Sequence, residues 1–292
     1  MTVITAPPVV PSSGNQIARL GRFARRNPTV LLGAAILIFF LGVAIVAPLI
    51  AGDPMMKLPT RRLQPPSQAL WFGTDHLGQD VFARTVYGAR VSLIVGFSVA
   101  TISILVGLTI GLFAGYYRWF DGIVMRLMDG LMAIPAILLA IAMVSLNQGS
   151  IGIVIAAISI PELPRVVRLV RSIVLSVKEL PFVEAAIACG ARTPRILFRH
   201  IMPSTIAPLI VQATYICASA ILVEASLSFL GAGVPPEVPS WGNMIASSRL
   251  YLARAPWTIF CPAIALALVV LAVNLLGDGL RDRLDPRLSR RL

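Results

Sequence analysis

Long runs of apolar residues without a charge are the feature that most restricts how this chain can fold. The run from Thr29 to Ala51 contains no Asp, Glu, Lys or Arg. As a helix it would be about 35 Å long, enough to cross the roughly 30 Å hydrocarbon core of a bilayer. Only 13% of all residues are charged and 57% are hydrophobic, whereas soluble domains carry roughly 25% charged residues. The sequence therefore predicts an all-α integral membrane protein and excludes a disordered chain, a coiled coil and an ordinary soluble enzyme.

Six apolar segments have the length of transmembrane helices, so the expected fold is a polytopic six-helix protein. They are predicted at 29–51, 91–115, 123–146, from 151 onward, 206–230 and 257–276. Pro135 is expected to kink the third of them. The chain divides into an N-terminal segment, a first helix, a loop, a core with five further helices and a tail, at 1–28, 29–51, 52–89, 90–279 and 280–292. A long polar segment, 173–204, interrupts the core.

The distribution of basic residues predicts the orientation. With the N-terminus inside, the inner segments carry 18 Lys and Arg residues and the outer segments carry 7. Because cytoplasmic loops are enriched in Lys and Arg, both termini, Arg118 and the segment 173–204 are expected in the cytoplasm. The loops 52–89 and 231–256 are then external. The net charge of +12 indicates anionic membrane lipid rather than nucleic acid as its counterpart.

Few residues offer catalytic or metal-binding chemistry. The two histidines, His76 and His200, are far apart and have no neighbouring His or Cys, so no metal site is expected. The three cysteines form no disulfide framework. Neither lysine follows a glycine, so the Gly-Lys-Ser/Thr sequence of a nucleotide-binding loop is missing. We expect no catalytic residue, no bound cofactor and no ATPase activity in this chain.

Two features within the apolar segments point to helix contacts. Gly107, Gly111 and Gly115 recur every four residues and would form one stripe on a helix, along which another helix could pack closely. The neighbour is expected to be a helix of this chain rather than of a partner. Glu224 lies inside the fifth apolar segment, where a lone carboxylate is costly. It is either a contact of a transport pathway or a hydrogen-bonded clamp between helices, and we favour the clamp.

The polar segment 173–204 contains a helix–glycine–helix pattern. Its elements are Glu184-Ala185-Ala186, then Gly190, then a second helix from about Pro194, and a closing Pro203. Gly is typical just after a helix end and Pro in a first helical turn. The pattern alone leaves two interpretations open: a compact docking element on the cytoplasmic face, or an amphipathic connecting loop.

This segment resembles the EAA loop of importer-type ABC permeases, which carries Glu-Ala-Ala, a Gly four residues later and a closing Pro. The rest of the chain is similar to the second (C-type) permease of the dipeptide, oligopeptide and nickel branch. One signature is Phe72-Gly73-Thr74-Asp75, and the further matching segments are 88–93, 224–231, 239–242 and 274–286. The resemblance spans about residues 25–287. Gln79 departs from it, because this branch usually has Arg there.

The resemblance implies the fold of a type I ABC importer permease and a function in binding-protein-dependent import, expected for di- or oligopeptides. The chain would form half of the pathway beside a homologous permease. Two ABC ATPase subunits, which bind the ATP, would dock on Glu184, Ala185, Ala186, Gly190 and Pro203, and an external solute-binding protein would deliver the solute. The expected location is the bacterial inner membrane. Two alternatives stay open: the same importer for nickel, an opine or an oligosaccharide, or an ATP-independent carrier or channel.

Overall fold

The computed structural model describes residues 28–146 and 150–284, and within these ranges the chain is helical, without a strand. A single isolated bridge pairs Thr74 with Asp80. The α-helices are α2 (Pro28–Ile50), α3 (Val81–Tyr116), α4 (Arg118–Ala133), α5 (Ala136–Leu146), α6 (Ile151–Val177), α7 (Pro181–Ala188), α8 (Thr193–Arg195), α9 (Met202–Phe229), α10 (Trp241–Ser248) and α11 (Trp257–Leu284). Two short 3-10 helices and a π-helical stretch accompany them: η1 (Pro59–Arg61), η3 (Arg249–Tyr251) and η2 (Ile196–Ile201). The expectation of an all-α protein is confirmed.

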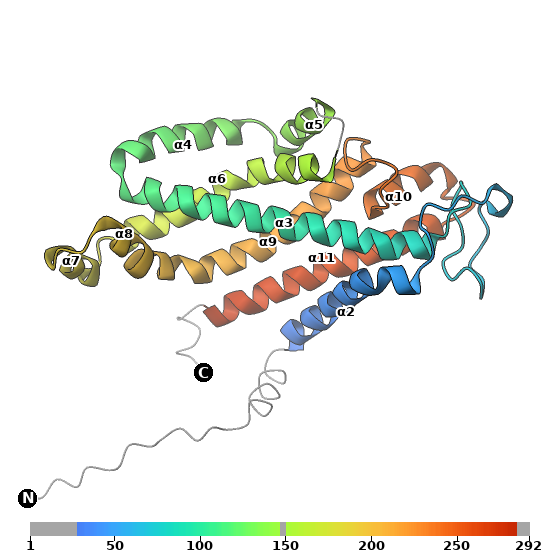
Figure 1. Cartoon of the computed structure of the whole chain (residues 1–292), viewed down its shortest axis with the longest axis horizontal. Helices are drawn as coiled ribbons and strands as arrows, with labels where there is room; N and C mark the ends of the chain where they lie inside the picture. The colour runs from blue at the N-terminus through green and yellow to red at the C-terminus, as the bar shows by residue number, and fades with distance from the viewer. Residues whose placement is uncertain (1–27, 147–149, 285–292) are drawn as a thin grey trace, which may run out of the picture.

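The long helices α2, α3, α6, α9 and α11 run lengthwise beside one another (Figure 1). At one end of the bundle lie α7 and α8, and at the opposite end lie α10 and the loop between α2 and α3. A continuous core of buried Val, Ile, Leu and Ala side chains joins these helices. The two ends of the bundle are therefore built from different segments, which will matter for function.

Four helical stretches are long and apolar enough to cross a membrane, and the bent pair α4 and α5 would be a fifth if it counts as one span. The four are Pro28–Ile50, Val81–Tyr116, Thr193–Phe229 and Trp257–Arg283. The fourth expected span, α6, is not among them, because it carries Glu162 and three arginines. By length and composition, the described structure therefore has four spans, or five if α4 and α5 together make one. The expected number of six is reached only when α6 is counted as well.

The third expected span, 123–146, is wrong as a single helix. It consists of α4 and α5, which meet at an angle of 87°. The break lies at Pro135, as expected, since Ile134 before it is extended (φ −94°, ψ 128°), the conformation that a following proline favours. Arg168 and Arg171 of α6 pair with Asp129 (2.5 Å) and Asp121 of α4.

Other boundaries also differ from those predicted. α3 begins at Val81, ten residues before the expected start, because Asp80 caps it by accepting a hydrogen bond from the Phe82 amide (2.8 Å). The loop that we expect to be external therefore ends at 80 rather than 89. α11 continues to Leu284, beyond the expected helix end at 276 and into the predicted tail. Nearly all of the N-terminal segment 1–28 and residues 285–292 of the tail lie outside the described residues.

Candidate functional site

The helix α7 carries the Glu-Ala-Ala sequence, and a proline and a glycine set where it begins and ends. Pro181 occupies its first turn after an extended Leu180, a position where proline costs no hydrogen bond. Past its C-terminus, Gly190 has a φ of +78°, which a residue with a Cβ adopts only under strain. The amide of Ala191 donates to the carbonyl of Ala186 (3.0 Å), the bond pattern of a glycine-ended helix. The local sequence thus explains why α7 is short and turns sharply.

The surface of α7 is divided between one anchoring side chain and an open face. Val183 is fully buried and joins the main core beside η2. Glu184 and Ala185 are exposed, and Ala186 is half-buried. A Cβ added at Gly190 would meet no atom within 4 Å. The predicted coupling residues from 184 to 190 therefore lie together on one exposed element at the end of the bundle.

Large apolar side chains of α7 and of the following η2 are exposed as well. Phe182 is 48% exposed and Ile187 is 51% exposed, and Phe198 of η2 is 52% exposed. In the bundle, side chains of this kind would face lipid, but α7 lies beyond the helix ends (Figure 1). An exposed cluster of large apolar residues marks an interaction surface. The α7 element has the composition of a docking surface.

The second half of the polar segment does not end at Pro203. α8, η2 and α9 follow without a gap, and Thr193–Phe229 forms one long helical stretch. The π-helical turn of η2 explains this continuity, because the Met202 amide bonds to the Leu197 carbonyl, five residues back. Such a turn changes which carbonyls need partners near Pro203, whose nitrogen has no hydrogen to donate. The predicted separation between a loop ending at 204 and a span from 206 is wrong.

The glycine stripe of α3 faces α6 of the same chain. A Cβ at Gly107, Gly111 or Gly115 would lie 2.5, 2.7 or 2.6 Å from Val166, Val170 or Val174, respectively. Real Cβ atoms essentially never come this close to a neighbour. The glycines therefore permit an α3–α6 approach that larger residues would prevent.

Glu224 of α9 is fully buried and hydrogen-bonded. Ser228 Oγ donates to its Oε1 (2.8 Å), and Ser92 Oγ of α3 lies at 3.5 Å from Oε2. Ser240, which caps α10, also bonds to this carboxyl group. The serines come from α3, α9 and the cap of α10, so the geometry is that of a clamp between helices.

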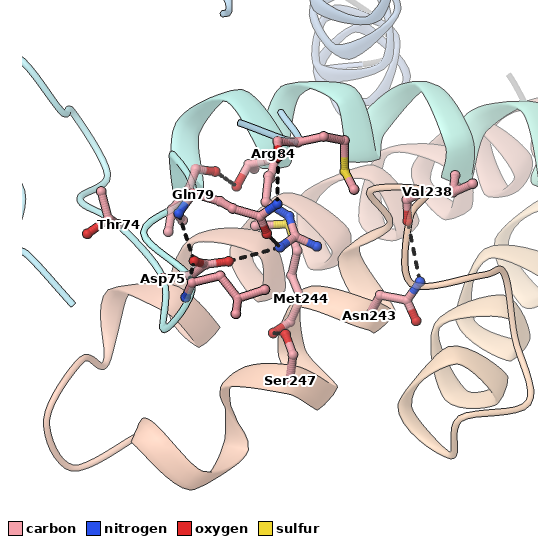
Figure 2. A network of polar contacts seen from close by, with 12 residues as sticks. Thr74, Asp75, Gln79, Arg84, Val238, Asn243, Met244 and Ser247 are labelled. Atoms are coloured by element: carbon pink, nitrogen blue, oxygen red, sulfur yellow. Dashed lines mark hydrogen bonds and ion pairs between the residues drawn. The ribbon is translucent and has the colours of Figure 1, made fainter. Parts of the chain in front are cut away.

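A buried polar network at the end opposite α7 was not anticipated from the sequence. Arg84, at the start of α3, is 5% exposed, and its Nη1 pairs with Asp75 Oδ2 at 2.9 Å and also donates to Gln79 Oε1. Nearby, Trp241 of α10 donates from Nε1 to the Thr85 carbonyl (2.9 Å). Figure 2 shows Arg84 beside Asp75 and Gln79, with α10 close by. The sequence offered one signal for this network, since Asp75 and Arg84 carry opposite charges on either side of the start of α3.

The described ranges 28–146 and 150–284 contain no group of three or more His, Cys, Asp or Glu residues that could hold a metal ion. The described residues form two distinctive groups instead: the exposed helix α7 with apolar neighbours at one end of the bundle, and the buried polar network of Arg84 at the other.

Comparisons with known proteins show the family of the chain. Residues 107–290 match the family described as binding-protein-dependent transport system inner membrane component, and residues 16–66 match the N-terminal TM domain of oligopeptide transport permease C. A structure titled as inward-facing conformations of the MetNI methionine ABC transporter has a TM-score of 0.54 and 19% identity, over 70% of this chain and 97% of that one. That likeness concerns the fold alone.

Curated relatives are similar over nearly their whole length. A probable peptide ABC transporter permease from Sinorhizobium fredii is 63% identical over 92% of this chain and 93% of its own. A dipeptide transport system permease from Alkalihalophilus pseudofirmus is 46% identical over 91% and 88%, and a glutathione transport system permease from Pectobacterium atrosepticum is 40% identical over 92% and 90%. These matches confirm the resemblance found in the sequence. The chain therefore belongs to the binding-protein-dependent transport system inner membrane components, the membrane permeases of ABC importers.

Proposed function

We propose that this chain is one of two homologous permease subunits of an importer for di- or oligopeptides. The observation that carries the proposal is the α7 element, an exposed helix with apolar neighbours at one end of a membrane bundle. The names of its relatives support the substrate class, since they are described as peptide, dipeptide and glutathione permeases. All three substrates are peptides or peptide-like molecules.

The coupling step follows from how α7 is connected. An ABC ATPase subunit docks on the face that carries Glu184 and Ala185, and its closure on ATP displaces α7. Val183 of α7 is buried beside η2, so the displacement passes to η2. Because Thr193–Phe229 is one helical stretch, it then reaches α9 without a flexible joint. Access to the pathway is thereby switched between two states, which ATP biases.

The remaining assignments rest on sequence and family. The chain has no Gly-Lys-Ser/Thr sequence, so the ATP is bound and hydrolysed by two partner ATPase subunits. An external binding protein delivers the peptide to the end formed by α10 and the loop before α3. The positive-inside count of 18 against 7 supports placement in a bacterial inner membrane with α7 and both termini in the cytoplasm.

Transport by the reconstituted importer tests this proposal. The full chain is assembled with its permease partner, both ATPases and the binding protein in proteoliposomes, and ATP-driven uptake of a labelled dipeptide is compared with uptake of labelled Ni²⁺. We expect uptake of the dipeptide only. Uptake of Ni²⁺ alone, or uptake of dipeptide without any ATPase, would contradict the assignment.

A variant of the docking face tests the coupling role. Glu184→Trp places a bulky side chain on the exposed face of α7 and should abolish both uptake and the stimulation of ATPase activity by the binding protein. The purified variant should still insert and fold, since position 184 is exposed. Glu179→Trp, an exposed glutamate outside α7, is the matched control and should retain stimulation. If both variants lose ATPase stimulation equally, Glu184 has no specific role in coupling.

A further inference from the structure

A charged pair of α6 lies halfway along the bundle, and its arginine is accessible. Arg165 stands 14 residues after the start of α6 and 12 residues before its end, so each helix end is about 20 Å away. Its Nη1 donates to Oε2 of Glu162, one turn earlier, at 3.4 Å. The side chain of Arg165 is 49% exposed, whereas that of Glu162 is 11% exposed. The arginine therefore presents its charge outward at the middle depth of a membrane bundle.

The helix α9 completes this cluster. The guanidinium of Arg165 lies over the ring of Tyr215, 5.7 Å from the ring centroid, which is the geometry of a cation–π contact. Tyr215 stands 13 residues after the start of α9 and 14 residues before its end, so both helices contribute from their midpoints. Ser219, one turn further along α9, interacts with the carboxyl group of Glu162. Tyr215 is itself 52% exposed, so the cluster is held from two helices and still accessible.

A groove of about 540 Å³ begins at Tyr215 and extends along α9 and α11. Its polar lining from α11 is Asn274, Asp278 and Arg281, which are all exposed. Their spacing of three to four residues places them on one face of the helix. The stripe ends near Leu284, where α11 ends, and it accompanies α9 toward its start, which lies at the α7 end (Figure 1). A polar surface thus continues from the middle of the bundle to that end.

Lipid does not suit the face that carries Arg165. A charged side chain at the centre of a bilayer is costly, and such residues face a protein interior or a water-filled cavity. Because half of the Arg165 side chain is exposed in this chain, its cover comes from outside the chain: a water-filled pathway or the surface of a partner subunit. The hollow beside Tyr215 favours the pathway, since packed interfaces are as dense as protein interiors. Many transporters bind their substrates near the midplane of the bilayer.

We propose that Arg165 binds the C-terminal carboxylate of the transported peptide at the midpoint of the pathway. This assignment rests on the proposed function, because it takes the solute to be a peptide. A guanidinium has five N–H donors and binds carboxylates through two of them at once. Among the described residues, Arg165 has one recorded hydrogen bond, the long one from Nη1 to Glu162, so most of its donors are left for a ligand. Glu162 is a positioning residue, which holds the arginine beside Tyr215.

Uptake by the complete importer in proteoliposomes tests this assignment. The probes are labelled glycyl-phenylalanine and its C-terminal amide, each offered with saturating binding protein. Because the binding protein is unchanged, the ratio of variant to wild-type uptake reports on the permease. Arg165→Gln should lower uptake of the free acid about tenfold, since a charge-assisted interaction is lost, and should change uptake of the amide by less than about twofold. Arg165→Lys, which keeps the charge, should recover part of the loss.

Arg168→Gln is the matched control. Arg168 lies one turn further along α6 and is 44% exposed, but it pairs with Asp129 of α4 instead. Its replacement should leave the ratio between the two probes unchanged. If Arg165→Gln lowers uptake of both probes equally, or separates the permease pair during size-exclusion chromatography, Arg165 contacts the partner subunit and the proposal is overturned.

The same measurements separate this proposal from the importer function. Uptake of glycyl-phenylalanine that is normal in the wild type and unchanged in Arg165→Gln would refute the site and leave the importer function standing. If the wild-type importer takes up no glycyl-phenylalanine, the importer function is refuted, and the peptide site is refuted with it.

Discussion

The two ends of the bundle contain similar residue types, but one end buries its polar and aromatic side chains and the other exposes them. At the end with α10, polar and aromatic side chains turn inward: Asp75, Arg84 and Trp241 are all buried and find partners within the chain. At the other end, Glu184 and Phe182 of α7 turn outward, and Val183 is the one fully buried residue of this helix. The polar side chains at the α10 end are paired within the chain, whereas those of α7 are left exposed.

This difference separates a structural end from an end that fits the proposed docking role. A buried ion pair is costly to form and strongly destabilising to break, so the polar residues at the α10 end belong to the fold. An exposed apolar element marks an interaction surface, which is what the proposed function requires of the α7 end. Substitutions at the two ends should therefore differ in kind: loss of stability at one, loss of coupling at the other.

The largest expected effect is on the free energy of unfolding, when a buried tryptophan at one end is compared with an exposed tryptophan at the other. Trp241→Ala removes a fully buried ring that donates to Thr85 and contacts Phe40 edge-on (centroids 6.0 Å). It should lower the free energy of unfolding by roughly 3–5 kcal/mol, measured by thermal unfolding in detergent. Trp119→Ala, at a residue 70% exposed near the α7 end, should change stability little. Similar losses in both variants would break the comparison between the ends.

The next effect concerns the helix pair that joins the two ends. Gly111→Leu forces a side chain into Val170 and the Val167 carbonyl of α6 and should destabilise the solubilised protein by about 1–3 kcal/mol. Thr109→Leu, on an exposed face of the same helix, is the control and should be mild. Equal tolerance at positions 109 and 111 would show that the glycine stripe has no role in packing.

A matched pair of glycines compares the ends with the same backbone change. Gly190 near α7 and Gly231 near α10 have φ values of +78° and +81°, and an added Cβ meets nothing within 4 Å at either. Alanine should therefore add a similar strain of about 1–2 kcal/mol at each position. Only Gly190→Ala should reduce ATPase stimulation, since it alters the turn after α7. If Gly231→Ala reduces stimulation equally, coupling is not confined to the α7 end.

The smallest perturbation is a chemical label that leaves the fold unchanged. Cys189, at the end of α7, is exposed, whereas Cys217 is buried and Cys261 is intermediate. A membrane-impermeant maleimide should label Cys189 rapidly in inside-out vesicles and not in right-side-out vesicles. A Cys189→Ser variant identifies the labelled site by mass spectrometry. Labelling of Cys189 from the outer face would reverse the predicted orientation.

Several features could be predicted because they depend on local sequence. The first helix was expected at 29–51 and is Pro28–Ile50, since an uninterrupted apolar run leaves few other conformations in a membrane. The turn at Gly190 and the break at Pro135 were also anticipated, because glycine and proline act on their own backbone. The single helix predicted over 123–146 was wrong, because Pro135 separates two helices at 87° rather than kinking one.

The sequence by itself determined the all-α membrane class, the family and the helix–glycine turn at Gly190, because apolar length, turn residues and motifs are properties of contiguous segments. Only the tertiary structure decided what lies opposite each motif. It brought Gly107, Gly111 and Gly115 against valines of α6, Glu224 among serines of three elements, and Arg84 beside Asp75 and Gln79. These contacts join residues from different segments, and their partners are fixed by how the helices pack rather than by any local preference.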